Sequence, residues 1–385
     1  MTTVLLTALE ASGDVLGAEL MAALRRRLGP DVRFIGVGGP AMAAAGLASA
    51  FDIAELSVVG VIEGLFAYRR ADRRARELTD LAIREKADIA VLIDSWGFSY
   101  LLGRRLRAAS PRLPLVKYVA PQAWATRPGR AKALARIFDR LLSIIAFEAP
   151  LFEAAGIRTT FVGHPALAED VPAGDGGRLR SQIGAGEGDP VLLILPGSRA
   201  SEVARLMPPF EEAVALLKAD RPSLYVVVAP AETVADHVIA RVAGWPFRAH
   251  LIQDVQGRRD AMAGADVALA CSGTVTTELA VAGCPMIVAY RLGELGYQIA
   301  KRIVRTRFIT LINIAADAAV APEMIQDDCT GPKLARELAR LLDDPELRAA
   351  QSAAQAQALE ALGGRGPAPA ERAADAIFEM LSSRS

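Results

Sequence analysis

We predict an α/β protein with two Rossmann-like, doubly wound domains that face a central cleft. The chain has 385 residues, which is too long for a domain with a single hydrophobic core and long enough for two domains of roughly 150–200 residues each. Short β-rich apolar runs alternate with longer Ala-, Leu- and Arg-rich runs of helical period, which indicates parallel sheets with crossover helices. This alternation stops once, near the middle of the chain, and then restarts, so a second unit is built like the first.

The elements of the first half follow one another as strand, helix, strand. Helical runs at Ala18–Arg27 and Arg70–Glu85 separate apolar runs of strand length. Between Ala166 and Asp189 the composition becomes rich in Gly, Pro and acids, which indicates a linker. The predicted strands of this half are TVLLTAL, VRFIGVGG, IAVLID, LPLVKYVA, RLLSIIAF and TTFVG.

The second half repeats the pattern after the linker. Its predicted strands are VLLILPG, LYVVVAP, RAHLIQD, VALACSG and PMIVAY, again with helical runs between them. From about Asp344 the chain is Ala- and Glu-rich and helical. We therefore place the first domain at 1–168 and the second at 169–344, and we expect the helical tail 345–385 to pack back on the first domain.

Composition excludes several classes of protein. Lys and Arg together number 44, as do Asp and Glu, so there is no overall basic field to attract nucleic acid. Three scattered cysteines without a CxxC pair argue for a reducing compartment and against disulfides or a zinc site, and we expect no metal. The N-terminus lacks a basic leader and no run of about 18 apolar residues occurs, so we expect a cytoplasmic protein without a membrane span.

The segment Val191–Glu202, VLLILPGSRASE, is the most informative about chemistry. A buried strand runs into a turn of Gly197, Ser198 and Arg199, and the helix that follows carries Glu202. We predict Glu202, like Gly197 and Ser198, as a substrate contact. Backbone N–H groups, a hydroxyl and a guanidinium at the carboxyl end of a strand suit a diphosphate. A capped turn with a solvated arginine is the alternative from local sequence alone.

A second strand end, within Val267–Tyr290, carries related chemistry. The small residues Ser272, Gly273 and Thr274 lead into a helix whose start can hold phosphate oxygens. Glu278, about one turn into that helix, is placed to accept both hydroxyls of a ribose, although an acid there also suits the helix dipole. Because both segments lie at strand ends of one predicted domain, their pairing favours a nucleotide-diphosphate site.

In the first half, the first strand is followed by a short turn that opens a helix. Its candidate substrate contacts are Glu10, Ser12, Gly13 and Asp14. Gly13 permits close approach of a ligand, and Ser12 or Asp14 can cap the helix. An alanine stands where a dinucleotide-binding fingerprint begins with glycine, so the segment is not that fingerprint. Tight-turn chemistry alone is the alternative.

Later strand ends and loops of the first domain supply further candidates. Asp94 ends the strand IAVLID, where its carboxylate can remove a proton from an attacking sugar hydroxyl; capping of the next helix is the alternative. Gln122, Trp124 and Arg127 share a loop that suits sugar stacking and an anionic group, or is a solvated basic loop. His164 stands where the chain leaves the first domain and either lines the cleft or is structural.

An apolar stretch at residues 58–68 is followed by an arginine cluster at residues 69–76. Apolar residues beside arginines suit docking on an anionic bilayer surface or acceptance of an acyl chain. A buried helix followed by a solvated one explains the same pattern.

The ordered set of short motifs resembles the lipid-A-disaccharide synthase family, glycosyltransferases with the GT-B architecture of two Rossmann-like domains. The resemblance runs from about residue 4 to 335, and the order makes it specific although each motif is short. The motifs are EASGD at 10–14, FIGVGGPAM at 34–42, LSVVGVIEGL at 56–65, PQAWATRPGRAK at 121–132, FVGHP at 161–165, LPGSRASEV at 195–203, SGTVTTELA at 272–280, PMIVAYR at 285–291 and AKRIVRTRFITLIN at 300–313.

The resemblance implies an inverting transfer that needs no metal or cofactor. A 2,3-diacylglucosamine moves from its UDP donor, bound on the second domain, to the 6-hydroxyl of 2,3-diacylglucosamine 1-phosphate on the first, giving a β-1,6 disaccharide and UDP. Family members are peripheral proteins on the cytoplasmic face of the inner membrane, and a homodimer is a candidate assembly. By motif, Ser198 and Arg199 would hold diphosphate. Glu278 would hold the ribose, and Asn313 would lie near the donor.

The chain departs from the family pattern at the expected base. Many members have IDSPDFN where this chain has IDSWGFS, so the second acid is Gly97 here while the first stays as Asp94. Either Asp94 serves as base, or Glu10 or Asp14 does, or the chain is a non-catalytic lipid- or nucleotide-binding relative. WAWR has also become WATR, and LPN has become LIN. A UDP-N-acetylglucosamine 2-epimerase and a peptidoglycan-precursor transferase share the architecture and stand as rival functions.

Overall fold

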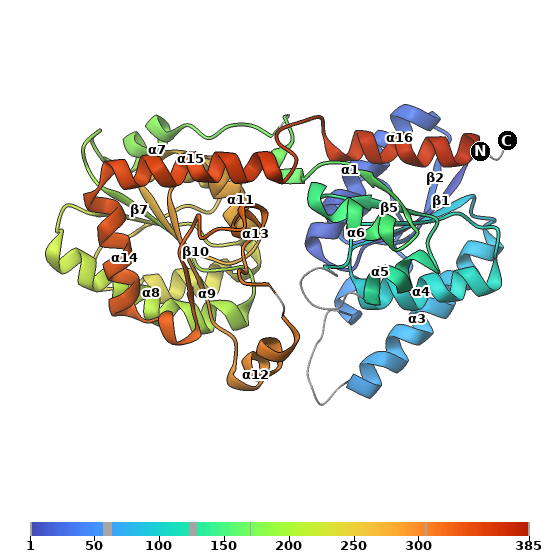
Figure 1. Cartoon of the computed structure of the whole chain (residues 1–385), viewed down its shortest axis with the longest axis horizontal. Coiled ribbons are helices and arrows are strands. Elements are labelled where there is room, and N and C mark those ends of the chain that lie inside the picture. The colour runs from blue at the N-terminus through green and yellow to red at the C-terminus, as the bar shows by residue number, and fades with distance from the viewer. Residues whose placement is uncertain (1, 57–63, 123–128, 170, 305, 384–385) are drawn as a thin grey trace. The chain divides into compact units, whose positions relative to one another are not determined.

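The chain folds into two compact units, each built on its own sheet (Figure 1). Unit 1 comprises Met1–Ala168 and Gly366–Ser385, and unit 2 comprises Glu169–Arg365. The structure is a computed structural model, and it describes residues 2–56, 64–122, 129–169, 171–304 and 306–383.

The sheet of unit 1 is six-stranded and parallel, in the order β2-β1-β3-β4-β5-β6. In its centre, Val4 of β1 pairs with Phe34 of β2 and with Ile89 of β3. Every residue of β1 and β3 is buried, and β3 is apolar throughout, because helices cover both faces of a parallel sheet. The strands are β1 (Thr3–Thr7), β2 (Arg33–Val37), β3 (Ile89–Ile93), β4 (Leu115–Tyr118), β5 (Arg140–Ser143) and β6 (Arg158–Phe161).

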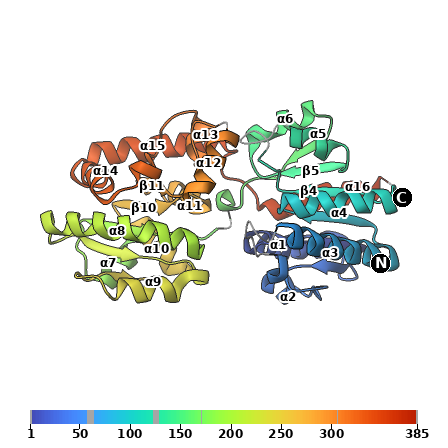
Figure 2. The same ribbon diagram turned by 90° about the horizontal axis from the view of Figure 1, so that it is seen from below.

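Alternate residues of β1 show how the two faces of this sheet are filled. Val4 and Leu6 belong to a core shared with α1 and α16, whereas Leu5 belongs to a core shared with α3 and α4. The helices α3 and α4 lie side by side (Figure 2). The helices are α1 (Ala11–Leu28), α2 (Pro40–Ala44), α3 (Gly64–Arg84), α4 (Trp96–Ala109), α5 (Gly129–Ala135), α6 (Ala149–Ala154) and α16 (Pro369–Ser382), with 3-10 turns η1 (Ile53–Leu56), η3 (Ala146–Glu148) and η4 (Pro165–Leu167).

The returning tail is shorter than the predicted segment 345–385. The helix α15 (Pro345–Ala361) packs with α11, α13 and α14 inside unit 2, and only α16 packs on α1. The buried face of α16 includes Ala373, Ala374 and Ile377, and Arg140 at the start of β5 donates a hydrogen bond of 2.8 Å to the Ala376 carbonyl. A glycine- and proline-rich junction separates the two helices. The sequence prediction treated them as one segment because both are rich in Ala and Glu.

Unit 2 has a second six-stranded parallel sheet, in the order β12-β11-β10-β7-β8-β9. The sequence did not indicate β12, which has only three residues. The predicted linker also contains a helix, α7, which Asp175 caps by accepting a 3.0 Å hydrogen bond from the N–H of Arg178. The strands are β7 (Val191–Leu195), β8 (Tyr225–Val228), β9 (His250–Leu251), β10 (Val267–Cys271), β11 (Met286–Tyr290) and β12 (Glu323–Ile325).

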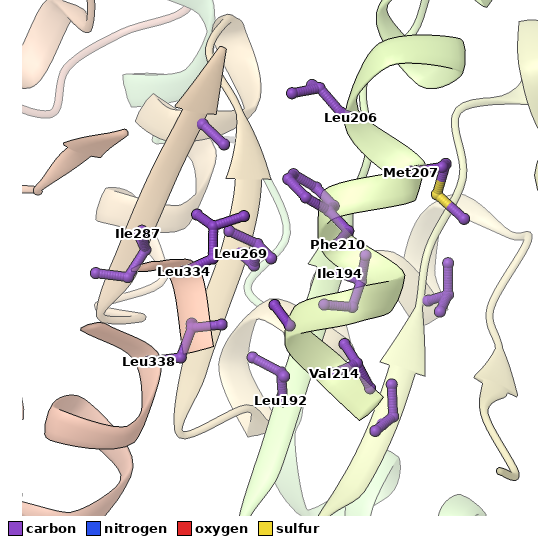
Figure 3. Close-up of a cluster of buried hydrophobic side chains, with 14 of the residues drawn as sticks. Leu192, Ile194, Leu206, Met207, Phe210, Val214, Leu269, Ile287, Leu334 and Leu338 are labelled. Carbon is purple, nitrogen blue, oxygen red and sulfur yellow. The ribbon is translucent and has the colours of Figure 1, made fainter. Parts of the chain in front are cut away.

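One face of this second sheet is covered by α8 and α14 (Figure 3). Phe210 of α8 and Leu334 of α14 pack over Leu269 of β10, and all three are fully buried. This packing fixes the carboxyl ends of β7 and β10 relative to each other. The helices are α7 (Gly176–Ile183), α8 (Ala200–Asp220), α9 (Ala235–Val242), α10 (Val255–Gly264), α11 (Thr274–Val281), α12 (Glu294–Ile303), α13 (Leu311–Ala316), α14 (Gly331–Asp343) and α15, with 3-10 turns η5 (Glu232–Val234) and η6 (Gln326–Asp328).

Candidate functional site

The turn after β7 is shaped by a glycine and by an internal carboxylate. Gly197 has φ +110°, and a Cβ there would lie 2.9 Å from Oε2 of Glu202, so only glycine fits. The N–H groups of Ser198 and Arg199 both donate to that Oε2 at 3.3 Å. The Arg199 guanidinium donates to Oε1 of Glu202 at 2.8 Å. Glu202 was predicted from the sequence as a substrate contact, but its buried carboxylate instead organises the turn from inside.

The Arg199 side chain keeps 68% of its surface exposed, while the Glu202 side chain keeps 8%. An anionic ligand can therefore approach the guanidinium from outside the turn without displacing the buried carboxylate. Arg205 lies on the same helix, and its guanidinium would be 3.4 Å from a Cβ placed on Gly293. Burial raises the pKa of Tyr290 at the end of β11, with Glu202 acting in the same direction and Arg199 and Arg205 against it. Sequence reasoning missed Arg205 and Tyr290, which stand outside the strand-turn motif.

The turn after β10 lies beside the turn after β7, because the two strands are neighbours in the sheet. A Cβ on Gly197 would be 3.2 Å from Sγ of Cys271, the residue before Ser272. Gly273 and Thr274 are exposed where α11 begins, and nothing lies within 4 Å of a Cβ at Gly273. The structure thus brings together the two segments that the sequence paired, and it leaves an open helix N-terminus between them and solvent.

Glu278 has a partner that the sequence did not reveal. Arg258 of α10 donates to Oε2 of Glu278 at 3.5 Å, and both side chains are about one-third exposed. The contact is long for a charge-assisted hydrogen bond, so the carboxylate keeps accepting capacity on its exposed side. Glu278 therefore remains accessible from solvent beside the α11 turn.

Asn313 differs from the expectation of a group that faces the donor. It is fully buried, and its amide donates to the Ala321 carbonyl at 2.7 Å and to Glu323 at 2.9 Å. Its own oxygen accepts from the N–H of Ala321 at 2.8 Å. Because its amide links α13 to Ala321 and to Glu323 at the start of β12, Asn313 holds this segment together and does not face a ligand.

In unit 1, the turns after β1 and β3 meet. Gly13 lies against Asp94, with a Cβ on the glycine 3.6 Å from the Asp94 Cβ. The Ser95 hydroxyl donates to Oε1 of Glu10 at 3.1 Å. Asp94 and Ser95 have φ values of +47° and +39°, the left-handed region that non-glycine residues seldom adopt. Two predicted motifs therefore form one acidic edge that includes Glu10 and Asp94.

Asp14 has an internal role that removes it from the candidate bases. Its carboxylate is buried and accepts three backbone N–H groups at the start of α2, from Gly39 at 2.7 Å, Ala41 at 2.8 Å and Met42 at 3.0 Å. Both oxygens are occupied in capping that helix. Ser12, two residues earlier, is exposed.

The remaining candidates of unit 1 have different outcomes. Nδ1 of His164 accepts the N–H of Ala166 at 3.2 Å, and burial lowers the pKa of His164 to about 4, so the ring is a neutral cap of η4. This supports the structural alternative for His164. Gln122 is exposed, and Trp124 and Arg127 lie outside the described residues.

A buried lysine that sequence reasoning missed lies under the Asp94 turn. Lys117 of β4 is 1% exposed, and burial lowers its pKa to about 7, while the Asp94 and Glu10 carboxylates act to raise it. Gly97 is exposed in the first turn of α4, and nothing lies within 4 Å of a Cβ placed there. The acid that the resemblance leads us to expect at this position would therefore fit sterically.

Two features are absent from the part of the chain that the structure describes. No cluster of three or more His, Cys, Asp or Glu side chains could hold a metal ion there. No helix within these described ranges is long and apolar enough to cross a bilayer. The apolar stretch predicted at 58–68 falls largely outside the described residues, but the arginines after it lie on α3.

Comparison with known proteins extends over almost the whole chain. A family model described as lipid-A-disaccharide synthetase matches residues 4–377. A lipid-A-disaccharide synthase of Paramagnetospirillum magneticum is 42% identical, covering 97% of this chain and 96% of its own length. One of Ruegeria pomeroyi is 43% identical, covering 97% of this chain and 94% of its own length.

Solved structures share the fold at much lower identity. The calicheamicin glycosyltransferase CalG4 gives a TM-score of 0.63 at 19% identity, covering 99% of this chain and 98% of that one. MurG of Acinetobacter baumannii gives a TM-score of 0.59 at 16% identity, covering 98% and 100%. The fold is therefore the α/β, GT-B-like fold predicted from the sequence. By its family match and its full-length relatives, the chain belongs to the lipid-A-disaccharide synthase family, the glycosyltransferases of lipid A biosynthesis.

Proposed function

We propose that the chain transfers 2,3-diacylglucosamine from its UDP conjugate to the 6-hydroxyl of 2,3-diacylglucosamine 1-phosphate. The donor nucleotide would bind unit 2 at the ends of β7 and β10, and the acceptor would bind unit 1 at the ends of β1 and β3. The observation that carries the donor site is that the turns after β7 and β10 lie side by side, since a Cβ on Gly197 would be 3.2 Å from Sγ of Cys271 at the end of β10. The exposed Arg199 guanidinium and the open start of α11, gathered at neighbouring strand ends, suit a pyrophosphate.

Each step of the transfer has a candidate group. The Asp94 carboxylate takes the proton of the 6-hydroxyl as that oxygen attacks the anomeric carbon. The bond from that carbon to the diphosphate oxygen breaks, its electron pair leaves with UDP, and attack from the opposite face gives the β-1,6 linkage. The Arg199 guanidinium and the start of α11 stabilise the charge that develops on UDP, and Glu278 accepts the ribose hydroxyls.

The proposal is tested by product analysis with purified protein. We expect a phosphorylated disaccharide and UDP from the diacylated donor and acceptor, and much slower UDP release from UDP-N-acetylglucosamine. Release of UDP from the unacylated donor at an equal rate would favour another UDP-sugar enzyme. Donor binding without any disaccharide would favour the non-catalytic alternative that Gly97 raises.

We also propose that the protein is peripheral on the inner membrane, with a homodimer as a candidate assembly. Tyr68 is 60% exposed, and it lines an open surface depression of about 250 Å³ on α3 together with Arg69, Asp72, Arg73 and Arg76. Exposed arginines beside an aromatic ring suit an anionic headgroup layer. We expect co-sedimentation with phosphatidylglycerol vesicles that weakens as salt rises and is absent with phosphatidylcholine vesicles.

A further inference from the structure

The strongest feature that the proposed function leaves unused is the Lys117 ammonium. All three of its N–H groups donate to backbone carbonyls, to Leu92 at 3.1 Å, to Asp94 at 2.6 Å and to Tyr118 at 3.0 Å. These carbonyls belong to the carboxyl ends of β3 and β4, so one side chain ties two neighbouring strand ends together. The Tyr118 carbonyl also accepts the N–H of Asp94 at 2.9 Å.

The backbone around this ammonium is strained. Asp94, Ser95 and Val119 have φ values of +47°, +39° and +68°, and none of them is glycine. A β-branched residue such as Val119 is a marked outlier in this region. Such conformations persist only where surrounding contacts impose them, and they gather at functional sites. Two of the three carbonyls that Lys117 binds, those of Asp94 and Tyr118, belong to or directly precede the strained residues.

The hydrogen bonds of Lys117 also favour its charged form. Three carbonyl acceptors match the three protons of an ammonium, whereas a neutral amine has only two. Burial lowers the pKa of Lys117 to about 7, and the carboxylates of Asp94 and Glu10 act against burial and favour the charged form. Glu10 in turn accepts the Ser95 hydroxyl at 3.1 Å, so the buried cation lies beneath an edge that two carboxylates share.

We infer that Lys117 is a positioning residue, which holds the Asp94–Ser95 turn so that the Asp94 carboxylate faces the acceptor hydroxyl. The inference rests on the proposed function, because it assigns Lys117 to the base of that reaction. Lys117 acts through the backbone of Asp94 and does not touch the substrate. Because Gly97 stands where the family pattern has a second acid, the proposed reaction depends on the orientation of the Asp94 carboxylate.

The test compares Lys117→Met with Lys86→Met, which removes an exposed lysine of the same unit. We expect kcat for disaccharide formation to fall about 100-fold in Lys117→Met, the effect of displacing a reacting group by about 1 Å. The KM for the donor and the affinity for UDP should stay within about twofold, because the donor site lies in unit 2. Lys86→Met should match the wild type in all three.

A double-mutant cycle shows whether the effect passes through Asp94. In an Asp94→Asn background, adding Lys117→Met should lower kcat by less than about twofold, because the group that it positions is already disabled. Full additivity of the two losses would overturn the inference, as would a Lys117→Met enzyme with normal kcat. If Lys117→Met does not fold, Lys117→Gln, which keeps two donors, takes its place; its loss of kcat should be smaller and should disappear in the Asp94→Asn background in the same way.

A crystal structure of the Lys117 variant separates this inference from the proposed function. We expect Asp94 and Ser95 to leave the left-handed region once the ammonium is gone. A wild type that makes no disaccharide contradicts the proposed function, and the turn geometry then decides the inference by itself. An unchanged turn in the variant would overturn the role of Lys117 whatever the activity of the wild type.

Discussion

Arg199 tests the donor site at the scale of a single residue. We expect Arg199→Ala to lower disaccharide turnover about 100-fold or more, the usual loss when a group that stabilises developing charge is removed. Stability should change little, because the side chain is 68% exposed and Glu202 keeps its two backbone donors. Arg336→Ala is the matched control, since Arg336 is 67% exposed and pairs with a glutamate, Glu337. Near-normal turnover of the Arg199 variant would exclude its role.

Asp94 and Gly97 together test the identity of the base. We expect Asp94→Asn to lower kcat about 100-fold or more, within the range that general-base catalysis contributes. Gly97→Asp should fold normally, because nothing lies within 4 Å of a Cβ at that position. If Gly97→Asp restores turnover to the Asp94→Asn enzyme, either position can hold the base. Unchanged kcat in Asp94→Asn alone would remove Asp94 from the mechanism.

His164 predicts a loss of stability in acid. Its pKa is about 4 in the folded chain and 6.5 when unfolded, so protons bind the unfolded state first as the pH falls. The contribution of His164 to the free energy of unfolding is complete above pH 6.5. It is lost as the pH falls towards 4, and the loss totals about 3 kcal/mol. We expect His164→Asn, which keeps an acceptor for the Ala166 N–H, to show a shallower decline in urea unfolding across this window. An equal decline in His164→Asn would contradict the assignment, and exposed His237→Asn serves as control.

The sequence predicted the turns of the site, but it did not predict which buried side chains hold these turns in place by hydrogen bonds. Gly197 and Ser198 were recognised because a small-residue turn after a buried strand is a local signal. The inward direction of Glu202 and the burial of Lys117 depend on which strands are neighbours in the sheet. The local sequence does not indicate that order. Asn313 shows the same limit, since a motif residue can maintain a loop without facing its ligand.

At the scale of elements, the sequence predicted the alternation of helices and strands, including the two-residue β9, but it missed β12 and α7. The three-residue β12 is too brief for a period to appear, and the helix α7 was hidden in a segment of linker-like composition. The helical tail was predicted as one segment because α15 and α16 have similar composition. Which unit each packs on depends on its buried face.

The buried face of α16 supports a prediction about unit 1. Ala374 is 1% exposed within the core that α1 and α16 share, so Ala374→Asp would bury a charge without a partner. We expect a loss of about 3 kcal/mol or more in unfolding free energy, measured by urea unfolding. Ser382→Asp, an exposed change on the same helix, should change it by less than about 0.5 kcal/mol. Equal stability of the two variants would mean that α16 does not hold unit 1 together.

At the scale of the whole molecule, the two units differ in how the chain builds them. Unit 1 needs two separate segments, because Gly366–Ser385 returns to complete it, whereas unit 2 is the single stretch Glu169–Arg365. Unit 2 also has its own complete sheet and core. An independent domain of this size buries enough apolar surface to fold alone.

We therefore expect a fragment of residues 169–365 to unfold cooperatively and to bind UDP. Its affinity should fall at least tenfold in Arg199→Ala, because a charge-assisted contact to the diphosphate is lost. A fragment of residues 1–168 should be far less stable, since it lacks the helix that covers α1. Circular dichroism on urea titration and calorimetry with UDP measure both effects. If the 169–365 fragment folds but binds no UDP while the full chain does, then residues of unit 1 help to hold the nucleotide and the donor site proposed here is incomplete.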